Sequence, residues 1–268
     1  MVEFQRKDFY SYEDFLEIMR LLRAPGGCPW DREQTHSSIR RNFLEETYEV
    51  LDAIDHDDAS GMCEELGDVL MQVAFHAQIE AERGRFTMAN VVDGVARKLV
   101  YRHPHVFGDV QADTSQQVLT NWDVLKRREK GQRSTADAVE AVPHTLPALW
   151  RAEKIQSKTA KAGFDWTSSL QALDKLEEEV RELRAALEAG QAADAPHGIR
   201  EELGDTLFMA AKIAQMSGVD PEDALHRACD KFDRRFRAVE EAADKPLPEC
   251  GEAELPALWN DAKSHDPS

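Results

Sequence analysis

The chain repeats itself, and this repeat restricts the fold more than any other feature of the sequence. When the sequence is compared with itself at a shift of about 133 to 137 residues, five groups of residues coincide in the same order. Chance readily produces one such match, but not five in succession. We therefore predict two halves with the same fold, related by an ancient duplication. The matching groups are residues 45–49 with 178–182, residues 64–68 with 201–205, Gly84 with Gly218, Lys98 and Arg102 with Lys231 and Arg235, and Trp122 and Lys126 with Trp259 and Lys263.

The chain of 268 residues has room for two domains, since domains usually contain roughly 100 to 200 residues. Between the halves, residues 130–137 are polar and lack apolar periodicity, and Pro143 and Pro147 follow them. This composition is typical of a linker. We expect a first helical domain over residues 1–130, a linker over residues 131–147 and a second helical domain over residues 148–268.

Apolar residues recur at helical spacing around both acidic motifs, and no segment alternates as a strand does. Gly84 and Gly218 lie where a helix would end, and Asp220 followed by Pro221 is typical of a helix start. The sequence therefore predicts an all-α fold. The residues of the apolar stripes are Ile39, Phe43, Val50, Leu51 and Ile54 around the first motif, and Leu66, Leu70, Val73 and Ala77 around the second.

The charge of the chain excludes some partners. With 33 basic and 51 acidic residues the formal charge is -18, which disfavours polymeric nucleic acid and anionic membranes. A small phosphorylated ligand is compatible, because divalent cations held by carboxylates bridge two negative partners. The four cysteines form no Cys-x-x-Cys pair, and no segment approaches the roughly 18 apolar residues of a membrane span. We expect a cytoplasmic protein without zinc, disulfides, nucleic acid polymers or membrane among its partners.

Carboxylates gather at the repeated motifs. Residues three apart on a helix are neighbours on its surface, so Glu46 pairs with Glu49 and Glu65 with Asp68. If the two helices pack as an antiparallel pair, the four carboxylates converge on one site, as in helical bundles that hold metals. The second half repeats this arrangement with Glu179, Glu182, Glu202 and Asp205.

A cluster of this kind needs a cation, and oxygen ligands suit Mg²⁺, with Mn²⁺ as a substitute. A single Glu-x-x-Glu is usually ordinary solvated charge, but its recurrence with the same companions favours a metal site. Gly67 and Gly204 lie within these helices, where glycine costs about 1 kcal/mol of helix propensity. We expect them to permit the close approach of another backbone.

The order Glu-Glu-x-x-Glu and then Glu-x-x-Asp resembles the signature of MazG-type nucleoside triphosphate pyrophosphohydrolases. The acidic pairs alone would also fit relatives acting on dUTP or phosphoribosyl-ATP, but the resemblance covers nearly the whole chain. It implies an all-α fold with two tandem MazG-like halves, Mg²⁺ bound by the motif carboxylates, a homodimer, and hydrolysis between the α- and β-phosphates of a nucleotide. The other matching segments are residues 27–31, 44–51, 102–107, 163–166 and 231–236.

The catalytic hypothesis rests on the second half. Glu179 and Glu202 are candidate catalytic residues because they would bind the metal. The expected nucleophile is a water molecule whose pKa the metal lowers. Glu178 is a candidate to orient or deprotonate that water, although it lies about 100° from Glu179 around the helix.

Basic and aromatic residues near the end of the chain are candidates to bind the substrate. Lys231 and Arg235 lie four apart on one helix face, and Arg234 adds charge beside them. A solvated face with helix salt bridges is the alternative explanation. Lys175, Lys263 and Trp259 are further candidates, although Trp259 fits core packing equally well.

Three questions stay open at this point. We favour the second half as the main catalytic unit, because residues 98–102 contain two basic residues where residues 231–235 contain three. The rival functions are a non-catalytic helical metal-binding interaction protein and a pyrophosphohydrolase specialised for one non-standard nucleotide. The preference for base and sugar depends on pocket shape, which one sequence does not give.

Overall fold

A computed structural model describes residues 2–266, and every regular element within this range is a helix. This confirms the all-α expectation. None of these helices combines the length and apolar character that a membrane crossing requires.

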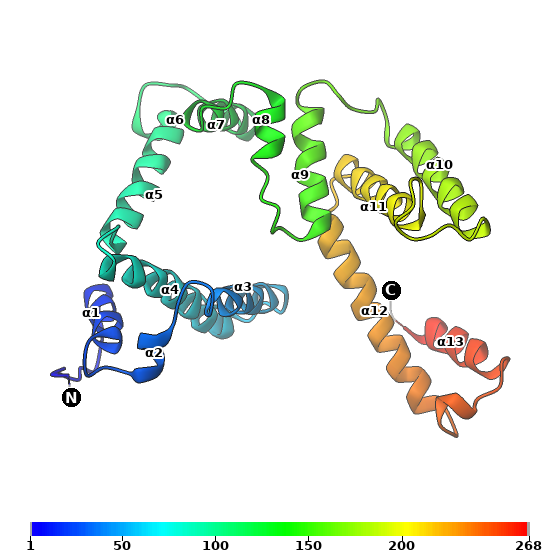
Figure 1. Cartoon of the computed structure of the whole chain (residues 1–268), viewed down its shortest axis with the longest axis horizontal. Helices are drawn as coiled ribbons and strands as arrows, with labels where there is room; N and C mark the ends of the chain where they lie inside the picture. Colours follow the sequence, from blue (N-terminus) through cyan, green and yellow to red (C-terminus); the bar gives the residue numbers. More distant parts are fainter. Residues whose placement is uncertain (1, 267–268) are drawn as a thin grey trace. The chain divides into compact units, whose positions relative to one another are not determined.

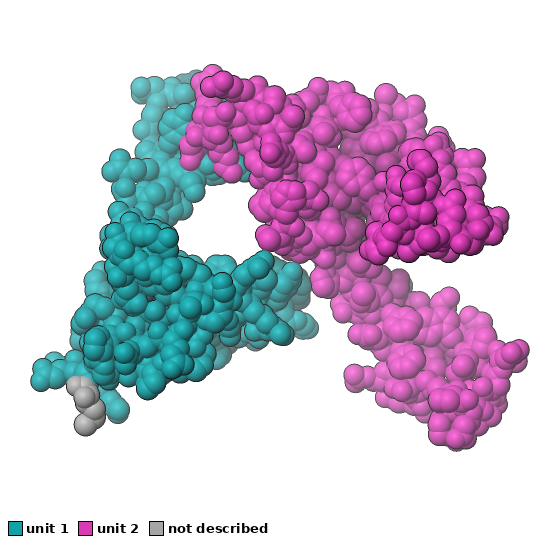
Figure 2. Space-filling model, viewed as in Figure 1, with its two compact units in different colours: residues 1–126 teal, residues 127–268 magenta. Residues whose placement is uncertain are grey.

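The contacts within the chain divide it into two compact units, residues 1–126 and residues 127–268 (Figure 2). The division falls within the last helix of the first unit, α7. The segment that we expect to be a linker contains the short helix α8, which starts at a capping box formed by Ser134 and Asp137. Ala138 of α8 is fully buried, and α8 packs against α9.

The first unit contains a long helical hairpin formed by α3 and α4 (Figure 1). α1 packs against α2 and α4, and α5 packs against α4 and α6. The helices are α1 (Tyr12–Arg23), α2 (Pro29–Glu33), α3 (Arg40–Asp55), α4 (Ala59–Glu82), α5 (Met88–Arg102), α6 (Pro104–Phe107) and α7 (Ser115–Glu129).

The second unit contains a matching hairpin formed by α10 and α11. α9 packs against α11 and α12, and α12 packs against α13 (Figure 1). The elements are α8 (Thr135–Glu140), α9 (Ala148–Ala160), α10 (Ser169–Glu188), α11 (Ile199–Met216), α12 (Pro221–Ala242), the 3-10 helix η1 (Leu247–Glu249) and α13 (Glu254–His265).

The two hairpins end in the same way but differ in their connections. Gly84 follows α4 and Gly218 follows α11, each with a backbone φ of 69°, a conformation that glycine adopts without strain. Asp220 caps α12 by accepting hydrogen bonds from the backbone N–H groups of Glu222 and Asp223. The helix stops and the helix start predicted from sequence are thus confirmed. The first hairpin is joined by residues 56–58 and the second by the longer segment 189–198.

The core of the first unit lies between α1, the start of α3 and the C-terminal part of α4. Its buried residues are Met19, Ile39, Ala74, Phe75 and Ile79. The predicted apolar stripe is therefore only partly buried within the chain. Ile39 and Ala77 are buried, whereas Ile54 and Leu66 are about half exposed, at 52% and 51%. The hairpin thus presents apolar side chains on its surface.

The expectation for the two motif glycines is wrong within each unit. A Cβ placed on Gly67 or Gly204 would meet nothing within 4 Å in the chain. Among the described residues of each unit, no backbone from outside the glycine's own helix comes this close.

Candidate metal centre

The first carboxylate cluster lies on the facing sides of α3 and α4. One carboxylate oxygen from each of Glu46, Glu49 and Glu65 lies within 4.8 Å of the others. Burial raises the pKa of Glu46, and the negative charges of Asp68 and Glu49 raise it further. Burial also raises the pKa of Glu65, together with the charges of Glu49 and Asp68. The hairpin thus brings all four carboxylates into one electrostatic site.

The second cluster lies on α10 and α11 at the matching positions. One oxygen from each of Glu179, Glu202 and Asp205 lies within 4.8 Å of the others. Glu179 and Glu202 are buried, at 7% and 5% exposure. Burial raises the pKa of Asp205, and the charge of Glu179 adds to this shift. Burial and the charge of Glu179 likewise raise the pKa of Glu182, the fourth member of the set.

These two sets fit a hard divalent cation. The converging atoms of both sets are carboxylate oxygens, which are the ligands that Mg²⁺ and Mn²⁺ prefer. Among the described residues, neither set includes an imidazole or a thiol. Burial raises the pKa values of Glu46 and Asp205, and repulsion from the neighbouring carboxylates raises them further. A bound cation would offset that repulsion.

The two clusters differ in one basic residue. Lys175 lies one turn before Glu179 on α10, with its Nζ atom 2.8 Å from Oε1 of Glu179 and 2.5 Å from Oε1 of Glu178. Hydrogen bonds to these two carboxylates raise the pKa of Lys175. In the first half the matching position is Asn42, which carries no charge. Only the second cluster therefore has an ammonium group at this position.

Glu178 lies outside the set of converging oxygens. It is exposed and paired with Lys175, whose hydrogen bond lowers the pKa of Glu178. Its expected role in orienting water stays a prediction.

Three of the basic candidates, Lys231, Arg234 and Arg235, lie on α12, a helix that runs away from the α10–α11 hairpin (Figure 1). Arg235 and Arg234 pair with Asp266, at 2.8 and 3.3 Å. Lys231 is exposed on the same helix, and Lys263 is exposed on α13. The ion pairs of Arg234 and Arg235 thus join α12 to Asp266 rather than to the carboxylates of α10 and α11.

Trp259 is half buried on α13, with its ring centre 5.2 Å from that of Phe232 on α12. It therefore contributes to the packing of α13 on α12. In the first half the matching Trp122 lies against Arg102, whose guanidinium is 5.3 Å from the ring centre. Both tryptophans thus tie the last helix of their half to the long helix before it.

Sequence reasoning missed Gln72, which is buried on α4 and forms a side-chain hydrogen bond with Glu46. Its position, four residues after Asp68 and on the same helix face, was the available signal. The second half has Met209 at the matching position, so this hydrogen bond belongs to the first cluster alone.

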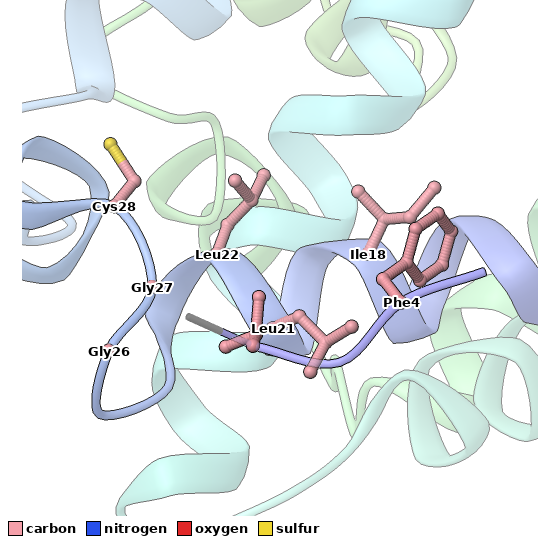
Figure 3. Close-up of a pocket in the computed structure, with 8 residues that line it drawn as sticks. Phe4, Ile18, Leu21, Leu22, Gly26, Gly27 and Cys28 are labelled. Carbon is pink, nitrogen blue, oxygen red and sulfur yellow. The ribbon is translucent and has the colours of Figure 1, made fainter. Parts of the chain in front are cut away.

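A separate apolar pocket of about 440 Å³ lies in the first unit between the N-terminal segment, α1 and the loop after it (Figure 3). No charged side chain lines it, so it offers nothing to hold a triphosphate. Its lining residues are Val2, Phe4, Ile18, Leu21, Leu22, Gly26, Gly27 and Cys28.

Comparison with known families finds the MazG nucleotide pyrophosphohydrolase domain twice in the chain, over residues 34–107 and 167–239. These ranges contain the α3–α4 and α10–α11 hairpins with their carboxylates. The predicted duplication is therefore confirmed.

Several known proteins are similar over most of the chain. A nucleoside triphosphate pyrophosphohydrolase of Escherichia coli is 46% identical over 226 residues, which cover 84% of this chain and 85% of that protein. The nucleoside triphosphate pyrophosphohydrolase/pyrophosphatase MazG of Thermotoga maritima is 41% identical over 258 residues, or 95% of this chain and 96% of that protein. The YabN protein of Bacillus subtilis is 42% identical over 260 residues, which are 95% of this chain and 52% of YabN. With two matching domains and relatives of this similarity, the chain belongs to the MazG nucleotide pyrophosphohydrolase family.

Proposed function

We propose that this protein hydrolyses nucleoside triphosphates to the monophosphate and pyrophosphate, with Mg²⁺ as the metal and Mn²⁺ as a substitute. The observation that carries the proposal is the convergence of carboxylate oxygens within 4.8 Å at the same positions of both MazG domains. The similarity to proteins named for this activity supports it. The proposed place of action is the cytoplasm, where nucleoside triphosphates are found.

The chemistry follows from the donor set. A divalent cation held by these carboxylates supplies electrostatic stabilisation to the phosphate oxygens and makes water more acidic. Glu179, Glu182, Glu202 and Asp205 would hold it in the second half, and Glu46, Glu49, Glu65 and Asp68 in the first. Glu178 would orient the attacking water once Lys175 no longer holds its carboxylate.

The second half is the proposed main catalytic unit. Lys175 lies beside its cluster and is a proposed contact to a bound phosphate, whereas Asn42 offers no charge in the first half. Lys231, Arg234, Arg235 and Lys263 are the proposed contacts to the remaining phosphate oxygens, and Trp259 the proposed contact to the base or sugar.

A homodimer accounts for two features of the single chain. Apolar side chains of α11 are exposed, among them Leu203 at 45% and Leu207 at 49%, and a second copy would cover them. The ion pairs of Arg234 and Arg235 on α12 go to Asp266 and not to the carboxylates of α10 and α11. We infer that each site combines the α10–α11 carboxylates of one copy with the basic face of α12 from the other.

Product analysis tests the proposed reaction. The purified protein is incubated with each common nucleoside triphosphate and Mg²⁺, and the products are separated by ion-exchange chromatography. Monophosphate and pyrophosphate are the expected products, and a chelator should abolish their formation. Diphosphate with free phosphate would indicate a different phosphohydrolase, and no turnover would favour the non-catalytic interaction protein. Turnover of a single non-standard nucleotide would identify a specialised member of the family.

A further inference from the structure

Lys212 is a buried lysine that the proposed reaction does not use. It lies on α11 with an exposure of 1%. Its Nζ atom is 2.5 Å from Oδ1 of Asp165 and 2.6 Å from Oε1 of Gln215. The same atom is 5.7 Å from the ring centre of Trp166. Burying an ammonium group is unfavourable unless such partners surround it, so this contact is demanding in its geometry.

Two of the partners of Lys212 come from the segment that leads into the opposite helix. Asp165 and Trp166 lie in the loop between α9 and α10, shortly before Ser168, which caps α10. The Lys212–Asp165 pair therefore links the C-terminal part of α11 to the beginning of α10.

The lengths of the two helices agree with a link at this end of the hairpin. Glu179 follows Ser169, the first residue of α10, by ten residues, and Lys212 follows Glu202 by ten residues. At about 1.5 Å per residue, Glu179 lies about 15 Å from the start of α10, and Glu202 lies about 15 Å from Lys212. With Lys212 held beside the segment that leads into α10, these lengths place Glu179 level with Glu202 on the antiparallel helices.

The other buried apolar side chains of the hairpin include Ala172, Ala186, Met209 and Ala211. None of them carries a charge, so none requires one particular partner across the hairpin. A slide of one helical turn, about 5.4 Å, would change which of these apolar side chains meet. It would, however, separate Lys212 from Asp165 and leave a buried ammonium without its counter-charge.

We propose that the Lys212–Asp165 ion pair sets the register of α10 against α11 and so holds Glu179 opposite Glu202 and Asp205. Lys212 is then a positioning residue for the metal centre. The proposal rests on the proposed function only in assigning these carboxylates to a metal.

The first half supports this interpretation with a different pair at the same place. The residue that matches Lys212 is Phe75 of α4, which is buried and has the guanidinium of Arg23 5.1 Å from its ring centre. Arg23 also donates hydrogen bonds to the backbone carbonyls of Asp31 and Gln34, in the segment before α3. In both halves, a cation beside an aromatic ring links the same position of the second hairpin helix, Phe75 or Lys212, to the segment before the first hairpin helix.

The test measures metal binding without relying on turnover. In a background with Glu46→Gln and Glu65→Gln, which disables the first cluster, Mn²⁺ binding is followed by electron paramagnetic resonance. Lys212→Met should weaken Mn²⁺ binding about ten-fold, by analogy with the loss of groups that support metal ligands. Lys154→Met, which removes an exposed lysine of α9 in the same unit, should leave binding unchanged.

A purely structural role would give a different result. The proposal would be overturned if Lys212→Met had a lower Tm but bound Mn²⁺ with an affinity within two-fold of that of the background. If Lys212→Met does not fold, Asp165→Asn replaces it, because Asp165 is partly exposed and asparagine keeps the side-chain volume while removing the counter-charge of Lys212. Weaker Mn²⁺ binding by folded Asp165→Asn supports the proposal, and unchanged binding overturns it. If the background binds Mn²⁺ but no triphosphate is hydrolysed, the proposed function fails while the register proposal is still decided by binding.

Discussion

Lys175 and Glu179 lie one turn apart on α10, and the ammonium nitrogen of the lysine is 2.8 Å from a carboxylate oxygen that belongs to the candidate metal centre. The side chain of Lys175 is about one-third exposed, at 36%, whereas that of Glu179 is 9% exposed. The lysine therefore acts as a counter-ion for a buried carboxylate. A divalent cation that binds Glu179 competes with this ammonium group for the same carboxylate, and a lysine released from it is available to a phosphate.

We expect Lys175→Met to separate metal binding from substrate binding. Without the competing ammonium group, the affinity for Mg²⁺ in the absence of nucleotide should increase by up to about five-fold, the effect of one exposed ion pair. The KM for the nucleotide should increase at the same time, because a phosphate contact is lost. Calorimetric titration with Mg²⁺ and steady-state kinetics measure the two effects. Weaker Mg²⁺ binding in Lys175→Met would contradict this view of the lysine.

Removal of a single carboxylate should affect the two halves unequally. Glu202→Gln or Asp205→Asn keeps the side-chain volume but removes a charged ligand, and we expect kcat/KM to fall by about 100-fold or more. Glu65→Gln in the first half should cause a smaller loss. Circular dichroism at 222 nm serves as the control, since all three variants should keep their helical signal. Equal losses from both halves would show that the first half is as important for turnover as the second.

A mixture of two inactive variants tests whether the site is shared between two copies. One chain carries Glu202→Gln, and the other carries Lys231→Ala with Lys263→Ala. If the site combines α10–α11 of one copy with α12 and α13 of the other, half of the dimers in an equal mixture contain one intact site. Activity should then recover to about a quarter of that of the wild type. If each site forms within one chain, mixing gives only the average of the two residual activities.

A pair of histidines in the first unit should make stability depend on pH. Nδ1 of His36 lies 2.7 Å from Nδ1 of His76, so one of these nitrogens must carry a proton while the other accepts it. His36 also contacts the buried Glu80, which pairs with Arg83 and Arg85. Burial lowers the pKa of His76 below 6.5, and the positive charge of His36 lowers it further.

The sign of this effect follows from the lowered pKa. The unfolded chain binds a proton at His76 more readily than the folded chain, so stability increases with pH in this range. The contribution of His76 is complete above pH 6.5 and is lost as the pH falls through the pKa of the folded state. We expect the Tm of metal-free protein to decrease between pH 7.5 and 5.5, and His76→Gln to reduce that decrease. His144→Gln, at an exposed site, should leave the slope unchanged. An identical slope in His76→Gln would show that other groups cause the dependence.

Much of the local structure could be predicted from the sequence. The spacing of Glu46 with Glu49, and of Glu202 with Asp205, places each pair on one helix face, because the geometry of a helix is the same in every protein. Glycines in the sequence marked the ends of α4 and α11, and an aspartate followed by a proline marked the start of α12. The duplication itself required no structure, since it is a property of residue order.

Contacts between distant residues were decided by the tertiary structure alone. The pairing of Lys212 with Asp165 joins residues 47 positions apart, and the sequence pattern around each gives no sign of the other. The same is true of His36 and His76. We expected another backbone to approach Gly67 and Gly204, and within each unit this expectation was wrong. The low helix propensity of glycine does not indicate which other segment packs against it.

The sequence by itself determined that this protein consists of two helical halves whose carboxylates recur at helical spacing. Only the tertiary structure decided that α10 and α11 pack in the register that brings oxygens of Glu179, Glu202 and Asp205 within 4.8 Å. It also decided that half of the apolar surface at Leu66 faces outward from the chain. The physical reason is that helix geometry follows from neighbouring residues, whereas the register and exposure of a helix depend on the packing of residues far apart in the chain.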